Sequence, residues 1–225
     1  NIDYVGFEPS ENVAAKATEN KIKTISKFFN IENIGNLKEF KKNTDAICAS
    51  NVICHIPDLK GLILTVDQLL SKKGVFVFEE PYMGSMFDKV SYDQIYDEHI
   101  FMFSVSSVKK IAEMYDYELV DILPQVTHGG SMRYVIARTK EHSINQKVIE
   151  ALSLEKKNNL DNIESCLIFK NNCEKSKNKI ITSLNNIKEE GKKICGYAAT
   201  SKSTTILNYC NLDKSIFDYI CDTTE

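Results

Sequence analysis

The chain has no excess of positive charge, because its 28 Lys and Arg are set against 31 Asp and Glu, for a formal net charge of −3. This balance gives no general attraction for nucleic acid or for an anionic membrane surface. The sequence also lacks long apolar runs: the longest, such as residues 74–78, have the length of a strand and not of a membrane-spanning helix. No signal peptide is recognisable. We therefore expect a cytoplasmic protein that acts on a small molecule and binds neither nucleic acid nor a membrane.

Metal-binding and redox motifs built on cysteine pairs are missing as well. No C-x-x-C occurs and the number of cysteines is odd, so the sequence predicts neither a metal site nor a redox motif within this segment. Most of the cysteines have apolar neighbours, and we expect them to be buried, reduced thiols. They are Cys48, Cys54, Cys166, Cys173, Cys195, Cys210 and Cys221.

Two nucleotide-binding signatures are absent. There is no G-x-x-x-x-G-K-[ST], so a phosphate-binding P-loop is excluded. None of the ten tyrosines has Lys four residues later, although short-chain nicotinamide-dependent oxidoreductases and epimerases need such a pair. That class remains an alternative without its usual catalytic motif.

Strand and helix patterns alternate through the first half of the chain. We expect strands at 4–7, 23–25, 44–50 and 75–78, and helices at 11–17, 37–40, 58–71 and 106–115. The near-continuous apolar character of residues 44–50 predicts a central parallel strand. Residues 72–74, Lys-Lys-Gly, are typical of the basic last turn and C-cap of a helix.

The alternation then stops. Strand patterns at 118–123 and 131–138 are separated only by a turn, and two consecutive strands without a helix between them must pair antiparallel. An α/β sheet that ends in such a hairpin predicts a class I methyltransferase-like (Rossmann-like) fold and not a NAD-binding Rossmann domain.

Composition divides the chain into three parts. Residues 1–139 carry the α/β pattern, and residues 140–192 are rich in Lys, Asn and Glu with spaced apolar positions. We expect the second part to be a helical linker that serves packing or dimerisation. Strand character returns at residue 194, so residues 193–225 begin a second α/β domain.

Titratable residues follow several of the expected strands. Glu8, His55 and Glu80 come at or just after strand ends, and residues 96–99 offer a phenol, two carboxyls and an imidazole between apolar flanks. In open α/β sheets the carboxyl edge binds ligands, and a carboxylate there suits a ribose diol. We expect these groups to share one cleft, where partial burial would tune them for acid–base catalysis. The alternatives are a solvated Glu8, a core histidine at His55 and a solvent-facing 96–99 turn.

A loop of small residues precedes a helix near residue 200. Thr200, Ser201 and Lys202 place hydroxyls and one cation at its N-terminus, which suits an anion such as a diphosphate. The alternative is an ordinary capped helix.

Seven short motifs lie in an order and spacing that are specific together, although each is weak alone. They are GFEPS at 6–10, SNVICHIP at 50–57, VFEEPY at 77–82, YDQIYDEH at 92–99, HGG at 128–130, GYAATSK at 196–202 and DTT at 222–224. Over essentially the whole chain they resemble the S-adenosylmethionine-dependent C-methyltransferases that act on nucleotide-linked keto-deoxysugars.

The resemblance implies a reaction in which a base removes the proton alpha to the 4-ketone of the sugar, and the resulting enolate takes the methyl group. It implies His99 as the base, Glu98 as its partner, and Tyr96 and His55 as stabilisers of the enolate oxygen. The implied cofactor residues are Glu8, Phe28, Phe29, Ser50 and Asn51. The implied substrate residues are Tyr82, His128, Thr200, Ser201 and Lys202.

The family plan also implies parts that this sequence lacks: a cysteine-rich zinc domain, the first strand with its glycine-rich loop, and most of the C-terminal domain. That last domain is Rossmann-like and would bind the sugar nucleotide, and residues 193–225 would be its beginning. We therefore expect the middle of a longer enzyme, with zinc only in the missing N-terminal domain. A NAD-dependent sugar-nucleotide oxidoreductase or epimerase and a non-catalytic sugar-nucleotide-binding domain remain as alternatives. The sugar, the nucleotide, the choice of carbon 3 or 5, and the oligomeric state stay open.

Overall fold

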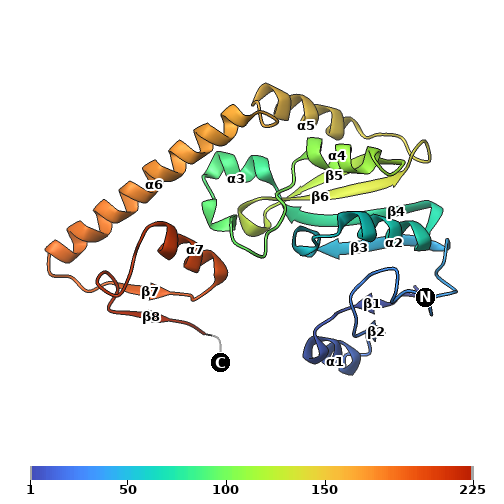
Figure 1. The fold of residues 1–225 in the computed structure, drawn as a ribbon, viewed down its shortest axis with the longest axis horizontal. Coiled ribbons are helices and arrows are strands. Elements are labelled where there is room, and N and C mark those ends of the chain that lie inside the picture. Colours follow the sequence, from blue (N-terminus) through green and yellow to red (C-terminus); the bar gives the residue numbers. More distant parts are fainter. Residues whose placement is uncertain (1, 224–225) are drawn as a thin grey trace.

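The centre of the molecule is a four-stranded mixed sheet (Figure 1). The computed structural model describes residues 2–223. Strands β3 and β4 pair in parallel, and β6 pairs antiparallel with both β4 and β5. In spatial order the strands are β3 (Thr44–Ser50), β4 (Leu70–Pro81), β6 (Ser131–Arg138) and β5 (Tyr117–Gln125). The β5–β6 hairpin is the one predicted from the missing helix, and it confirms the class I methyltransferase-like fold.

A second, two-stranded sheet precedes the first. Strand β1 (Gly6–Phe7) pairs in parallel with β2 (Thr24–Ile25), and α1 (Glu11–Glu19) connects them. The expected buried strand at 4–7 is therefore wrong in extent: only two residues are extended, and both are half-buried. The reason is that β2 is the only strand beside β1 in residues 2–223, so β1 lacks a second neighbour to cover it.

Strand β3 lies at the edge of the main sheet, which contradicts the expected central position. It pairs only with β4, and no strand of residues 2–223 pairs with its other edge. Four of its side chains are exposed in consequence: Asp45, Ala46, Cys48 and Ser50. An apolar strand pattern thus marked the residues correctly but did not reveal how many neighbours the strand has.

Helix α2 (Leu59–Leu69) begins where Asp58 accepts a hydrogen bond from the Gly61 amide at 2.8 Å. It ends at Leu69, and β4 starts at the next residue, so the predicted C-cap at 72–74 is wrong. Gly74 instead lies inside β4. A Cβ atom there would come within 2.6 Å of the Thr44 carbonyl oxygen, so glycine permits the close approach of β3.

The short helix expected at 37–40 is also absent. Turns connect β2 to β3, and the apolar side chains of this stretch close the core between the two sheets instead of forming one face of a helix. Leu37, Ile34 and Leu69 form this small buried cluster. Thr224, at the end of the last sequence motif, lies outside the described residues.

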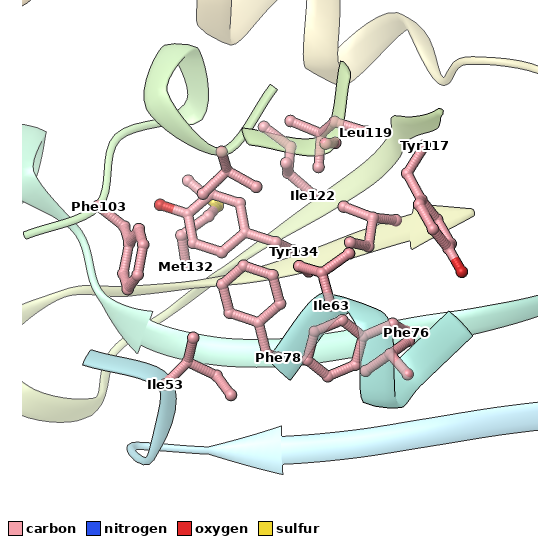
Figure 2. Close-up of a cluster of buried hydrophobic side chains, with 14 of the residues drawn as sticks. Ile53, Ile63, Phe76, Phe78, Phe103, Tyr117, Leu119, Ile122, Met132 and Tyr134 are labelled. Carbon is pink, nitrogen blue, oxygen red and sulfur yellow. The ribbon is translucent and has the colours of Figure 1, made fainter. Parts of the chain in front are cut away.

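The main hydrophobic core packs helices α2 and α4 (Val105–Glu113) on the main sheet. Figure 2 shows Phe78 of β4 between Phe76 of the same strand and Tyr134 of β6. The Phe78 ring centroid lies 5.3 Å from that of Phe76 and 5.1 Å from that of Tyr134. Burial of each such side chain stabilises the fold by about 1.5–3 kcal/mol. Phe103 packs edge-on against Phe78 at 5.9 Å and fixes the end of the segment that carries residues 96–99.

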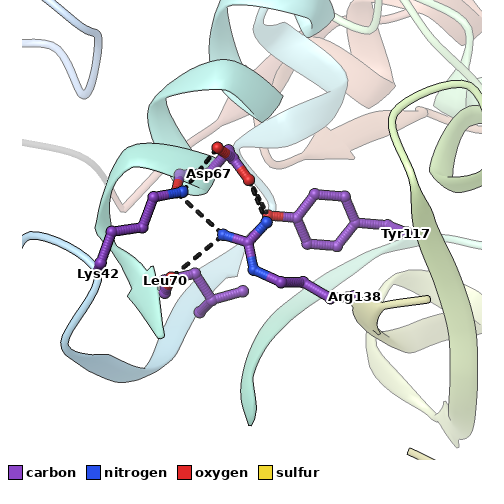
Figure 3. A network of polar contacts seen from close by, with 5 residues as sticks. All are labelled: Lys42, Asp67, Leu70, Tyr117 and Arg138. Atoms are coloured by element: carbon purple, nitrogen blue, oxygen red, sulfur yellow. Dashed lines mark hydrogen bonds and ion pairs between the residues drawn. The ribbon is translucent and has the colours of Figure 1, made fainter. Parts of the chain in front are cut away.

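A polar network centred on Asp67 joins the end of α2 to Tyr117 of β5 and Arg138 of β6 (Figure 3). The Asp67 carboxylate accepts hydrogen bonds from Lys42 at 2.8 Å, from the Tyr117 phenol at 3.1 Å and from Arg138. Burial raises the pKa of Asp67, but the hydrogen bonds and charges of Lys42 and Arg138 outweigh it and lower the pKa below its ordinary value. The network therefore needs an ionised Asp67.

Two helices lead away from the sheet and a small α/β unit returns to it. The helices are α5 (Gln146–Lys157) and α6 (Ile163–Glu189), and the 27 residues of α6 span about 40 Å. The unit consists of β7 (Cys195–Tyr197), α7 (Ser201–Tyr209) and β8 (Tyr219–Cys221). Its helix packs beside the turn η2 (Tyr92–Gln94), which follows α3 (Met83–Lys89). Segments from opposite halves of the chain thus meet at one place (Figure 1).

All seven cysteines are free thiols, but only Cys54, Cys173 and Cys210 are buried. The expectation of burial is wrong for the other four, which lie on the edge strand β3, on one side of α6 and on the two-stranded β7–β8 sheet: Cys48, Cys166, Cys195 and Cys221. Each of these elements has an uncovered face in residues 2–223. Among the described helices, none combines the length and apolar character that crossing a bilayer requires.

Candidate active site

The residues at 96–99 form a tight turn directly after η2. The backbone amide of His99 donates to the Tyr96 carbonyl at 2.9 Å, so the turn closes on itself. The His99 ring is held on both sides: Nδ1 is 2.8 Å from the Gln94 carbonyl oxygen, and Nε2 is 2.7 Å from the Tyr96 hydroxyl. Because a carbonyl oxygen only accepts, Nδ1 carries the proton and Nε2 accepts the hydrogen bond of the phenol.

His55 approaches this turn from the neighbouring strand. It ends η1 (Ile53–His55), which follows β3, and its Nδ1 donates to the Glu98 carbonyl oxygen at 2.8 Å. The rings of His55 and His99 lie 5.1 Å apart. The Cys54 carbonyl accepts a hydrogen bond from the Ile100 amide at 2.9 Å, which fastens the two segments together. The structure therefore brings three of the four expected catalytic side chains to one place.

Glu98 is the exception. Its contact with His55 is made by the backbone carbonyl, and the residue is exposed. The group that orients His99 is the carbonyl of Gln94, a residue that sequence reasoning missed. No sequence signal could have found it, because any residue at that position supplies the same carbonyl.

The surroundings of Tyr96 and His99 determine the protonation state of each side chain. Burial lowers the pKa of His99 below its ordinary value, and the charges of His55, Lys202 and His128 lower it further, against the opposing hydrogen bond with Gln94. Burial raises the pKa of the Tyr96 phenol. At neutral pH the pair is thus a protonated phenol and a neutral imidazole.

Glu80 does not face the cleft as expected, and it stabilises the backbone that carries His55. It is fully buried, and its Oε1 accepts the amides of Val52 at 3.0 Å and Ile53 at 2.6 Å. These bonds fix the start of η1 and hence the place of His55. Burial, with the adjacent Glu80 carboxyl, also raises the pKa of the Cys54 thiol.

An open groove of about 600 Å³ lies between this turn and α7. One wall contains Tyr96 and Asp97, and the other contains Thr200 and Ser201. The Thr200 hydroxyl accepts the Ser203 amide at 3.3 Å and caps α7. The groove therefore joins the acid–base turn to a hydroxyl-rich helix N-terminus.

Lys202 and His128 meet beside the groove. Lys202 Nζ lies 3.1 Å from Nδ1 of His128, an exposed residue with a positive φ of 52°. The His128 carbonyl accepts from the Gln94 side chain at 2.8 Å, and Lys89 donates to the neighbouring Gly129 carbonyl. These bonds hold the β5–β6 turn against the segment that carries His99.

Three of the expected cofactor residues come at strand ends, but in two different sheets. Glu8 follows β1 and accepts the Ser10 amide at 2.8 Å, whereas Ser50 and Asn51 end β3 in the other sheet. Asn51 has a φ of 53°, and its Oδ1 is buried without a hydrogen-bond partner. Such an orphaned acceptor fits a donor group of a bound cofactor.

The two phenylalanines expected near an adenine differ. Phe29 packs edge-on against Phe7 at 5.2 Å and against the core, so it is committed to the fold. Phe28 is 70% exposed and is the ring that remains available to a ligand.

Tyr82, expected in substrate binding, is half-buried and donates to the Glu155 carboxylate at 2.9 Å. Glu155 is buried on α5 and also accepts the amides of Val105 at 2.6 Å and Ser106 at 2.8 Å, so it caps α4. The pKa of Tyr82 is raised by burial and by this carboxylate. Sequence reasoning missed Glu155 because a Glu among lysines on a helix is typical of a solvated face.

Comparisons with known proteins give a consistent pattern. A family model described as a methyltransferase domain matches residues 1–122, and one described as a C-methyltransferase C-terminal domain matches residues 126–225. The C-methyltransferase NovU of Streptomyces niveus is 26% identical over 221 residues, which are 98% of this chain and 53% of that protein. The chain therefore spans about half the length of this curated relative.

The solved structures that the chain matches include two methyltransferases. Magnesium protoporphyrin IX methyltransferase from Synechocystis, with bound SAH, is 13% identical with a TM-score of 0.45, over 60% of this chain and 64% of that chain. A SAM-dependent methyltransferase from Anabaena variabilis is 17% identical with a TM-score of 0.43, over 60% and 67%.

Proposed function

Because the chain belongs to the methyltransferase domain family, we propose that it forms part of an S-adenosylmethionine-dependent C-methyltransferase acting on a nucleotide-linked 4-keto-deoxysugar. One observation carries the proposal: Tyr96, bonded to His99, lines the same groove as the hydroxyl-rich start of α7. The phenol of an acid–base pair and a candidate anion site thus line one groove. The matched C-methyltransferase C-terminal domain and the similarity to NovU support this reaction class.

S-adenosylmethionine supplies an electrophilic methyl group when bound. In this chain Glu8 would accept hydrogen bonds from its ribose hydroxyls, and Asn51 Oδ1 would accept one from a donor group. Ser50 would lie beside Asn51, and Phe28 would border the adenine. The buried, unpartnered Asn51 Oδ1 is the observation that fits this assignment.

The carbon beside a ketone becomes a nucleophile only after it loses a proton. His99 is the base, because its lowered pKa keeps Nε2 unprotonated at neutral pH. The substrate carbon displaces the Tyr96 hydroxyl from Nε2, and His99 takes the proton. The Gln94 carbonyl keeps the ring in the required tautomer by accepting from Nδ1–H.

Tyr96 then stabilises the enolate. Its raised pKa keeps the phenol protonated, so it donates a hydrogen bond where negative charge develops on the oxygen. His55, next to His99, offers a second polar group for the same oxygen. Glu98 contributes mainly through the backbone bond that orients His55.

The substrate's diphosphate needs local donors, since the chain as a whole is acidic. Thr200 and Ser201 offer hydroxyls at the N-terminus of α7, where the helix dipole favours an anion. Lys202 and His128 add nitrogen donors on the adjacent side, and Tyr82 borders the sugar. Binding between the two walls would place the keto group near Tyr96.

The same proposal covers the organisation of the protein. We assign residues 1–139 to the methyltransferase domain, 140–192 to a helical linker and 193–225 to the start of a sugar-nucleotide-binding domain. The match to 53% of NovU supports a longer enzyme. We also propose that this enzyme is cytoplasmic and that its structural zinc lies in a separate domain. A non-catalytic binding domain would leave the whole 96–99 cluster exposed and outside a cleft. Asp97 and Glu98 are exposed, but Tyr96 and His99 are half-buried and Tyr96 lines the groove.

Two measurements on the complete enzyme test the proposal. Calorimetric titration should show binding of S-adenosylhomocysteine and none of NAD; the reverse result would select an oxidoreductase. Methyl-labelled S-adenosylmethionine with a panel of nucleotide-linked 4-keto sugars should then give labelled product, and the labelled position would identify carbon 3 or carbon 5. Label on oxygen or nitrogen would overturn the C-methyltransferase assignment.

A further inference from the structure

Three metal-ligating side chains converge beneath the acid–base turn. The Cys54 sulfur, one ring nitrogen of His55 and one of His99 all lie within 4.8 Å of one another. Cys54 is buried, and the two histidines are half-buried, so solvent reaches the cluster from one side. The sequence pattern did not predict this cluster, because His99 comes from a different segment than Cys54 and His55.

Both histidines are oriented as metal ligands usually are. Each donates its Nδ1–H to a backbone carbonyl at 2.8 Å, His55 to Glu98 and His99 to Gln94. This fixes the tautomer and leaves Nε2 of each ring unprotonated, although in the free protein Nε2 of His99 accepts the hydrogen bond of the Tyr96 hydroxyl. The two imidazoles are therefore already oriented for coordination beside the Cys54 thiol.

A buried acidic side chain lies next to the cluster. Glu80 is fully buried, and its carboxyl group interacts with the Cys54 thiol. Two imidazoles and a thiolate suit zinc, cobalt or nickel, and they are poor ligands for magnesium or calcium. Tetrahedral coordination would require the three ligand atoms to move slightly inward.

We propose that Cys54, His55 and His99 form a binding site for a divalent cation of the zinc class, and that the bound ion blocks proton transfer at His99. Coordination uses the Nε2 lone pair that the Tyr96 phenol occupies in the free protein. One proton leaves the Cys54 thiol for each ion bound, and no electron is transferred. The site is thus inhibitory; the inhibition, though not the binding, rests on the proposed function.

Binding is tested on the 225-residue chain with Co²⁺ as the probe, because a cobalt-bound thiolate gives a charge-transfer absorption band. Wild type and the control Cys48→Ser, which removes an exposed cysteine, should bind one ion per chain with this band. Cys54→Ser should lose the band and bind at least tenfold more weakly. Zn²⁺ should displace Co²⁺, and Mg²⁺ should not.

The proposal fails if wild type does not bind Co²⁺, if Cys54→Ser keeps the band with unchanged affinity, or if Mg²⁺ competes as well as Zn²⁺. Circular dichroism checks that the variants fold. Because Cys54 is buried, His55→Gln at a half-exposed position provides a second test and should also weaken binding at least tenfold.

Inhibition is measured separately, as the ratio of substrate proton exchange with and without Zn²⁺ in the complete enzyme. The ratio should fall in wild type and Cys48→Ser but stay near one in Cys54→Ser. Equal inhibition of all three would overturn the inhibitory role. Binding of Co²⁺ without any proton exchange in any variant would instead remove the proposed function and leave the metal site standing.

Discussion

The Tyr96 phenol and the His99 imidazole share one hydrogen bond of 2.7 Å, and the Gln94 carbonyl holds the opposite side of the imidazole. This arrangement assigns each partner a protonation state at neutral pH: the phenol keeps its proton and the imidazole keeps its lone pair. The first predictions follow from that division.

Removal of the imidazole should stop proton abstraction. In deuterium washout from the carbon beside the ketone, we expect His99→Ala to be about 10²–10⁴-fold slower than wild type in the complete enzyme. Tyr96→Phe should lower the washout rate less than His99→Ala does, because the base His99 remains. Glu98→Gln should stay closest to wild type, since Glu98 contacts His55 through its backbone; a loss equal to that of His99→Ala would make Glu98 the base.

The pH dependence of the same exchange should report His99. Its pKa is lowered from 6.5, so the base is already unprotonated at neutral pH, and the rate should fall only below pH 6.5 as His99 gains a proton. The charge of Lys202 contributes to the lowering, so Lys202→Ala should move the midpoint to higher pH. A wild-type midpoint above 6.5 would contradict the assignment.

Lys202 should distinguish the two ligands. We expect Lys202→Ala to weaken sugar-nucleotide binding about 10- to 100-fold, because a charge-assisted hydrogen bond contributes about 1.5–3 kcal/mol. Affinity for S-adenosylhomocysteine should not change. Calorimetry with Lys214→Ala, an exposed lysine outside the groove, as the control separates this effect from a general loss of charge. Unchanged sugar-nucleotide binding would remove Lys202 from the site.

Asp67 should control stability and not activity. The Asp67→Asn substitution weakens bonds to Lys42, Tyr117 and Arg138, and we expect it to lower the free energy of unfolding by about 1–3 kcal/mol. The folded-state pKa lies below 3.8, so this stabilisation is present above pH 3.8 and is lost as pH falls through the folded value. Urea titrations of both proteins at several pH values should converge in acid; a constant difference would exclude this origin.

Glu155 should couple the linker helix to Tyr82. In Glu155→Gln one amide nitrogen would face a backbone N–H donor at the start of α4, and we expect a loss of about 1–3 kcal/mol in thermal or urea unfolding. Tyr82 would exchange its carboxylate acceptor for a weaker neutral amide oxygen and be held less firmly, so the KM for the sugar nucleotide should rise. Tyr82→Phe serves as the comparison: it should raise KM with a smaller loss of stability.

The hairpin and the amphipathic helices could be predicted from the sequence because periodicity reports which face of an element is buried. Residues 118–123 and 131–138 lacked an intervening helix, and that fixed their antiparallel pairing. The position of β3 could not be predicted, because apolar character does not tell a strand with one neighbour from a strand with two. Gly74 was misassigned because glycine is typical both of the end of a helix and of a close contact between strands, and the sequence does not distinguish the two.

For the site, the side chains His55, Tyr96 and His99 could be selected because their chemistry is visible in the sequence. The contacts that orient them could not. Gln94 orients His99 through its backbone carbonyl, and Glu80 accepts backbone amides of another segment. Glu155 belongs to a largely polar helix, but the fold buries it, and it accepts backbone amides at the start of α4. These are products of tertiary packing and carry no local pattern.

The two walls of the groove come from opposite halves of the chain, since Tyr96 follows the middle of the sheet and Thr200 follows α6. During synthesis on the ribosome the sheet and its core can close before α7 exists, because every strand of the main sheet precedes residue 139. The acid–base turn therefore forms first as an open surface, and the pocket for the substrate is completed last. A nascent chain halted before α7 would already carry the Tyr96–His99 pair, without the second wall that confines a ligand beside it.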